Sequence, residues 1–170
     1  GCGCPPAKRL QEVNYRRFCD CVLSRSLSRD DGWVGGGLGL ALHCDIRIVA
    51  QRAKIGANFA RLGIHPGMAI TELMVERVGF ETALELLCTG RLIRGAEAAR
   101  IGLILETVPD AELQAHALAF AKRMARVPLN QLVMLKLLCN QTAEHMGLAS
   151  NRILGTLFDG VARHTQEGLD

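Results

Sequence analysis

A run of three glycines followed at once by an apolar segment constrains this chain more than any other feature. Residues 35–37 are all glycine, and Leu38-Gly-Leu-Ala-Leu42 after them has the length of a short helix. Glycine lets the backbone turn sharply and approach a ligand closely, because it has no Cβ. A helix that starts there directs its unpaired N–H groups and the positive end of its dipole towards that ligand. The pattern predicts either a turn whose backbone donors hold a developing oxyanion or a turn that only closes a helix against a sheet.

The composition fits one globular domain. The chain has 170 residues, of which 49% are hydrophobic and 22% charged, a balance that supports a core and excludes disorder. No apolar run reaches the ~18 residues of a membrane-spanning helix. The net charge of +3 and the 4% of aromatic residues give no support for a nucleic-acid partner.

The seven cysteines fall into two groups. Cys44, Cys88 and Cys139 lie in apolar helical segments, where we expect them to pack as small hydrophobes. The others form two Cys-x-Cys pairs at positions 2, 4, 19 and 21. This spacing departs from the Cys-x2-Cys of zinc sites, so no metal is expected. The odd total argues against a full disulfide framework and favours a reducing compartment, such as the cytoplasm or the mitochondrial matrix.

Residues 1–31 differ from the rest of the chain. Turn-forming residues open the segment, polar residues without a clear period close it, and residues 8–27 give only a ragged apolar stripe. We expect a weakly ordered leader of unknown role.

Apolar periodicity after the glycines predicts short strands first and helices afterwards. The expected strands are residues 45–49, 54–57 and 103–108. The expected helices are residues 69–78, 81–88, 96–101, 110–127 and 128–148, with more helix towards 162. Gly90 is placed to end the second helix, and Asp110 to cap the fourth. This order predicts an α/β chain with a helical C-terminal part.

Several motifs resemble the enoyl-CoA hydratase/isomerase (crotonase) superfamily. They are Gly35-Gly-Gly-Leu-Gly-Leu-Ala-Leu-His-Cys-Asp-Ile-Arg-Ile48, Arg61-Leu-Gly-Ile-His-Pro-Gly67, Leu86-Leu-Cys-Thr-Gly-Arg91 and Ala96-Glu-Ala-Ala-Arg-Ile-Gly-Leu103. The match covers about residues 32–169 in the family's order and spacing.

The resemblance implies a fold and its division along the chain. The fold would be the α/β spiral of ββα units of the ClpP/crotonase type, truncated at the N-terminus. The leader would occupy residues 1–31, a partial crotonase-like core residues 32–109, and a helical trimerisation region residues 110–170.

The resemblance also implies an acyl-CoA thioester as ligand, with the thioester oxygen held between two backbone N–H groups. By position, the Gly36 N–H is one of these donors. The substrate-binding positions implied beside it are Gly35, Gly37, Phe59, Pro66 and Gly67. No separate cofactor is implied, since coenzyme A is part of the substrate. The expected assembly is a homo-oligomer, either a trimer or a dimer of trimers.

The sequence departs from the family at its chemical groups. The two glutamates of family hydratases would fall at Gly39 and Phe59, and neither residue transfers a proton. The loop that supplies the second oxyanion donor has no counterpart in residues 1–31. His65 is the candidate replacement acid/base, because its ordinary pKa of ~6.5 suits proton transfer. The alternatives are that His65 caps a loop and that Glu72, the next candidate, lies on a solvated helix face.

Two hypotheses therefore remain open. The chain is an acyl-CoA enzyme of the hydratase/isomerase type that uses a replacement base or a site completed across subunits. Alternatively, it is a catalytically silent relative that binds acyl-CoA or assembles with its relatives. A perturbed ionisable side chain beside Gly36 would favour the first, and apolar side chains there the second.

Overall fold

The computed structural model describes residues 32–145, 155–161 and 164. The expected leader and the two Cys-x-Cys pairs lie outside these residues. The strands are β1 (Gly32–Val34), β2 (Ile48–Ala50), β3 (Lys54–Gly56), β4 (Ile93–Arg94) and β5 (Glu106–Val108). The helices are α2 (Gly36–Leu42), α3 (Ile70–Val78), α4 (Phe80–Thr89), α5 (Gly95–Arg100), α6 (Leu113–Met124) and α7 (Leu129–His145), with the 3-10 turns η1 (Asn58–Leu62) and η2 (Asp110–Glu112). Residues 155–161 are also helical.

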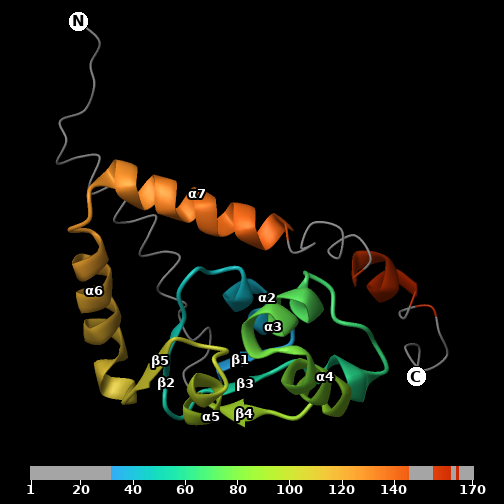
Figure 1. The fold of residues 1–170 in the computed structure, drawn as a ribbon. Coiled ribbons are helices and arrows are strands. Elements are labelled where there is room, and N and C mark those ends of the chain that lie inside the picture. The colour runs from blue at the N-terminus through green and yellow to red at the C-terminus, as the bar shows by residue number, and fades with distance from the viewer. Residues whose placement is uncertain (1–31, 146–154, 162–163, 165–170) are drawn as a thin grey trace, which may run out of the picture.

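The strands form two small sheets (Figure 1). In the first, β3 lies between a parallel β1 and an antiparallel β4, and in the second β2 runs parallel to β5. Gly32 lets β1 approach β3, because a Cβ there would lie 2.0 Å from the Lys54 carbonyl oxygen and its φ is +81°. The glycine turn follows β1 directly, so the first sheet sets its position.

The core lies between the first sheet and the helices α2, α3 and α4 (Figure 1). Helix α2 packs against β1 and α3, and α3 packs against α4. The largest fully buried side chains are Leu38, Leu42, Ile48, Ile55, Ile70, Met74, Leu86 and Leu103. Two of them come from α2, so the helix after the glycine turn is anchored by its apolar face.

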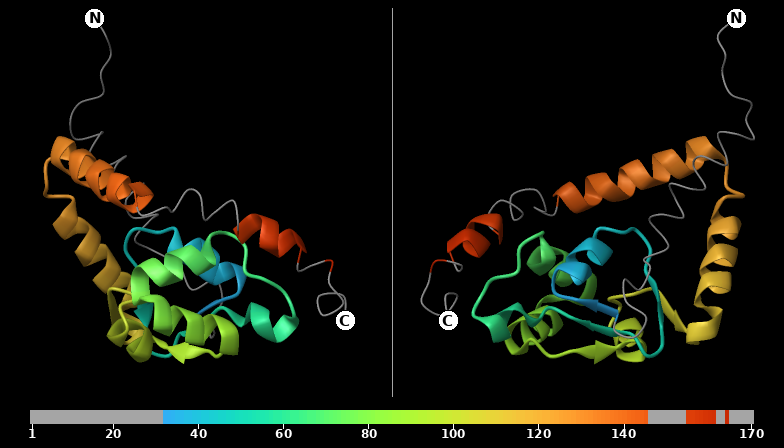
Figure 2. Two further views of the ribbon diagram at one scale, coloured as in Figure 1. Left: turned by 45° about the vertical axis from the view of Figure 1, so that its right-hand side comes forward. Right: turned by 180° about the vertical axis from the view of Figure 1, so that it is seen from behind.

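Helices α6 and α7 extend from this core as an arm (Figures 1 and 2). Leu113 and Phe120 of α6 pack against a small cluster of Ile48 and Val108. On α7, Leu132 is the one side chain between positions 129 and 142 that is not exposed. An ion pair from Lys136 to Asp45 joins α7 to the loop after α2.

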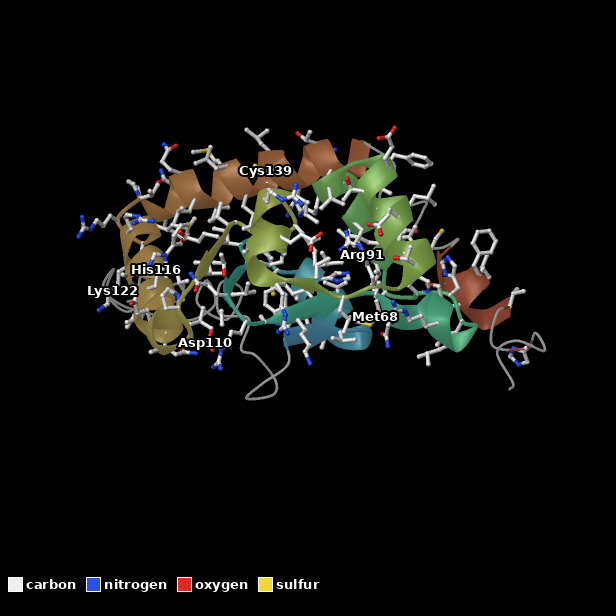
Figure 3. The ribbon with its side chains drawn as sticks, turned by 90° about the horizontal axis from the view of Figure 1, so that it is seen from below. Met68, Arg91, Asp110, His116, Lys122 and Cys139 are labelled. Carbon is white, nitrogen blue, oxygen red and sulfur yellow. The ribbon has the colours of Figure 1, made fainter. Side chains whose placement is uncertain are left out.

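The order of strands and helices confirms the α/β prediction, while four local expectations were wrong. The strands expected at residues 45–49 and 103–108 begin only at Ile48 and Glu106, where β2 and β5 start to pair with each other. Asp110 makes no capping hydrogen bond and pairs instead with Arg52. Cys88 on α4 is exposed and not packed in the core. The same holds for Cys139 on α7, which Figure 3 labels.

Candidate functional site

The glycine turn is fixed to the sheet by its own backbone. Gly35 has φ 57° and ψ −125°, and its N–H donates to the Gly56 carbonyl of β3 at 3.0 Å. Its carbonyl accepts the N–H groups of Leu38 at 3.0 Å and Gly39 at 3.3 Å. The N–H groups of Gly36 and Gly37 precede these first bonds of α2, so the helix itself provides no acceptor for them.

Gly36 and Gly37 are open on the side where a Cβ would stand. A Cβ at either residue would meet no described atom within 4 Å, and neither has a positive φ. Gly36 is exposed. Within the described residues, neither packing nor backbone conformation therefore requires glycine here, and the small residues leave the first turn of α2 accessible.

The turn η1 brings Asn58 and Phe59 to the glycine turn. A Cβ on Gly35 would lie 3.4 Å from Asn58 Oδ1 and 3.9 Å from Phe59 Cζ. Phe59 is half-buried and packs against the core. Its ring tip thus faces Gly35 as an apolar group that cannot move a proton.

Apolar side chains close the space beside Gly39, the position of the first family glutamate. Gly39 is buried, and a Cβ there would lie 3.2 Å from both Met68 Sδ and Ile70 Cδ1. Met68 and Ala69, just before α3, have φ of 58° and 53° although neither is glycine. Met68 lies close to the α2 ribbon in Figure 3 and is 45% exposed.

The loop that carries His65 faces the helix at residues 155–161. The His65 ring packs edge-on against Phe158, with 5.8 Å between ring centroids. Its Nδ1 is buried without a hydrogen-bond partner among the described residues. A Cβ on Gly67 would lie 3.3 Å from Asp159 Oδ2, and the half-buried Pro66 lies between His65 and Gly67. Among the described residues, none of these contacts of His65 reaches the glycine turn, so its acid/base role stays a prediction.

The carboxylate of Glu72 on α3 is not solvated as expected. It is half-buried, its Oε2 is buried without a partner among the described residues, and its Oε1 would lie 3.0 Å from a Cβ on Gly155. The solvated helix face expected for Glu72 was therefore wrong, because the helix at residues 155–161 covers this carboxylate.

Arg47, which the sequence reasoning passed over, fixes the far end of α2. Its Nε donates to the Leu103 carbonyl at 3.0 Å and its Nη1 to the Cys44 carbonyl at 2.6 Å. Burial, with a smaller effect of the nearby Arg77, lowers the pKa of Arg47 to about 10. An arginine between Ile46 and Ile48 was the available signal, because a charge in an apolar alternation needs buried partners.

No group of three or more His, Cys, Asp or Glu side chains among the described residues is placed to hold a metal ion. In the same residues, no helix is long and apolar enough to cross a membrane.

The family model for enoyl-CoA hydratase/isomerase matches residues 32–170. This chain belongs to that family. The decarboxylase PksI of bacillaene synthase from Bacillus subtilis is 32% identical over 122 residues, which are 72% of this chain and 49% of that protein. The probable enoyl-CoA hydratase echA8 of Mycobacterium bovis is 35% identical and covers 65% of this chain and 43% of its own length. The chain spans about half the length of the curated relatives it matches.

Solved structures of the family show the same fold. An enoyl-CoA hydratase from Mycobacterium smegmatis superposes with a TM-score of 0.76 at 37% identity, covering 95% of this chain and 56% of that one. The fold is therefore the crotonase fold. This chain covers a little over half of the length of the Mycobacterium smegmatis protein.

Proposed function

We propose that this chain binds acyl-CoA thioesters at the glycine turn, with the Gly36 N–H donating to the thioester oxygen. The observation that carries the proposal is the open first turn of α2, where Gly36 and Gly37 meet no atom of the described residues within 4 Å on their Cβ side, in a chain of the enoyl-CoA hydratase/isomerase family. A backbone donor held by the Gly35–Gly56 hydrogen bond needs no rearrangement to meet a developing oxyanion.

The proposed function does not include hydration by the family's two glutamates. Gly39 has no side chain, and the ring of Phe59 neither accepts nor donates a proton. We expect purified protein to leave the enoyl-thioester absorbance of crotonyl-CoA unchanged. Steady loss of that absorbance would show that another group, with His65 the first to test, acts as the base.

Substitution at Gly36 tests the proposed donor. Proline is tolerated at the first position of a helix and removes the N–H, so Gly36→Pro should fold but lose most of its affinity for butyryl-CoA. Gly36→Ala keeps the N–H and is the matched control. Calorimetric titration of both variants decides the point: equal affinity in parent and Gly36→Pro would remove the N–H from the proposal, whereas equal loss in both variants would indicate a steric effect.

Decarboxylation of a thioester with a carboxylate on its α-carbon is a second candidate reaction. The C–C bond to the carboxylate breaks, its electron pair moves into the thioester as an enolate, CO₂ leaves, and water returns a proton to carbon. No base is needed to start this step, in agreement with Gly39 and Phe59. The match to a Bacillus subtilis decarboxylase over 72% of this chain favours it. Release of CO₂ from malonyl-CoA, absent in Gly36→Pro, would support the candidate, and no release would reject it for that substrate.

We also propose that the chain assembles with further copies of itself through α7, as a trimer or a dimer of trimers. The apolar residues of α7 are distributed around the helix, and a helix apolar on all sides is normally buried. They include Leu129, Val133, Met134, Leu135, Leu137 and Leu138, all 38–67% exposed. Leu138→Glu should reduce the mass in light scattering towards the 18.4 kDa of one chain. Leu84→Glu on α4 is the control; a monomeric parent would refute the proposal.

A further inference from the structure

Two apolar side chains, Met68 and Ile70, lie beside Gly39 on α2. Gly39 lies three residues, about 4.5 Å of helix rise, from Gly36 along α2. A Cβ at Gly39 would be tighter than ordinary contact with two side chains, at 3.2 Å from Met68 Sδ and 3.2 Å from Ile70 Cδ1. A side chain at position 39 would therefore require Met68 and Ile70 to shift by a few tenths of an ångström.

Met68 and Ile70 occupy the space beside Gly39 in different ways. Ile70 is fully buried, as part of the core, whereas Met68 is 45% exposed. Met68 therefore has one side against Gly39 and the other open. An unbranched thioether side chain adapts its shape to an apolar neighbour, so Met68 can contact a ligand as well as the helix.

The backbone at Met68 supports a role beyond core packing. Met68 and Ala69 both have left-handed backbone conformations, with φ of 58° and 53°. Such conformations in residues other than glycine cost of order 1–3 kcal/mol each, and they persist where the surrounding structure holds them. With this backbone, Met68 Sδ lies 3.2 Å from where a Cβ on Gly39 of α2 would stand.

We propose that Met68 is a specificity-determining residue that selects apolar acyl groups next to the thioester. This rests on the proposed binding of the thioester oxygen at Gly36. An acyl group extending from that oxygen along α2 meets the exposed side of Met68, while the ring of Phe59 lies beside Gly35, before the start of α2. Both groups are apolar, so alkyl carbons gain from contact with them and polar substituents lose their hydration.

Affinities of acetyl-CoA and butyryl-CoA test this inference. Each methylene that becomes buried should tighten binding about fourfold, so the parent should prefer butyryl-CoA. Met68→Gln keeps the length of the side chain and adds an amide, and it should abolish the preference. Met68→Leu keeps an apolar side chain and should retain most of it. Calorimetric titration of the full chain gives all values.

The outcomes separate this inference from the proposed function. If the parent binds neither thioester, the proposed function fails and the inference with it. If the parent binds both but Met68→Gln keeps the same preference, the inference alone is overturned. Thermal melting adds a readout without ligand: Gly39→Ala should lower the melting temperature less in Met68→Ala than in the parent, and additive effects would contradict the contact between the two residues.

Discussion

Replacing the buried Arg47 by methionine should destabilise the protein by an amount that the structure allows to be worked out. Arg47 is 5% exposed and bonds the Leu103 and Cys44 carbonyls. Methionine has a similar length, so Arg47→Met removes both bonds and the charge without leaving a large cavity. The backbone bond from Leu105 N–H to the Arg47 carbonyl remains.

Two opposing effects set the size of the change. Hydrogen bonds from a charged donor contribute about 1.5–3 kcal/mol each. Because Arg47 is buried, we take a value in the upper part of this range, and losing both bonds then costs about 5 kcal/mol. Burial opposes the charge: lowering the pKa of Arg47 from 12.5 to about 10 corresponds to about 3 kcal/mol against the charged form. Methionine recovers that cost. We therefore expect a net loss of about 2 kcal/mol, or about 4–8 °C in Tm.

Thermal unfolding followed by circular dichroism measures this loss. Arg52→Met is the matched control, since the Arg52 side chain is 78% exposed and its pair with Asp110 should contribute less than about 1 kcal/mol. Arg47→Lys keeps a charge but not the two-pronged guanidinium, so it should fall between Arg47→Met and the parent. An Arg47→Met protein that melts at or above the parent temperature would refute the reasoning, because desolvation would then outweigh both hydrogen bonds.

Two further predictions concern stability. Gly32→Ala should cost about 2 kcal/mol or more, because its Cβ would lie 2.0 Å from the Lys54 carbonyl oxygen; Gly36→Ala should be near neutral, and equal melting of the two variants would contradict this. The hydrogen bond from Arg91 holds the pKa of Glu85 below its ordinary value of 4.5. Its contribution is therefore complete above that value and is lost as the pH falls through the folded-state pKa. Urea unfolding should show Glu85→Gln weaker than the parent at pH 7 and equal to it in acid; a pH-independent difference would rule out this origin.

Elements that carry their own end signals could be predicted from the sequence. Helices α3 and α4 lie within two residues of their expected bounds, and Gly90 ends α4 in the left-handed conformation. Strands β1 and β4 have three and two residues. Strand β1 ends at the glycine turn and β4 has only two residues, so neither carries an alternation of its own, and both are defined by their pairing with β3.

In the candidate site, too, features with a local sequence signal could be predicted and contacts between distant residues could not. The glycine turn could be predicted, because three successive glycines before an apolar segment are a local signal. The contact of Met68 with Gly39 joins residues far apart in the sequence, so no spacing indicates it. Met68-Ala69 follow Pro66-Gly67 without a further glycine, so nothing in the sequence indicates the positive φ that both residues adopt. The oxyanion donor, the division into leader, core and trimerisation region, and the assembly stay predictions.

The exposure of α7 has a consequence for amide hydrogen exchange. A helix held mainly by its own backbone bonds opens by fraying and local unfolding, at a free energy below that of the core. Amides of α7 should therefore exchange earlier than those of α3, whose residues Ile70, Leu73 and Met74 are buried. If copies of the chain cover α7, its protection should rise with protein concentration while that of α3 does not. The exchange rates of one helix would then report assembly separately from folding.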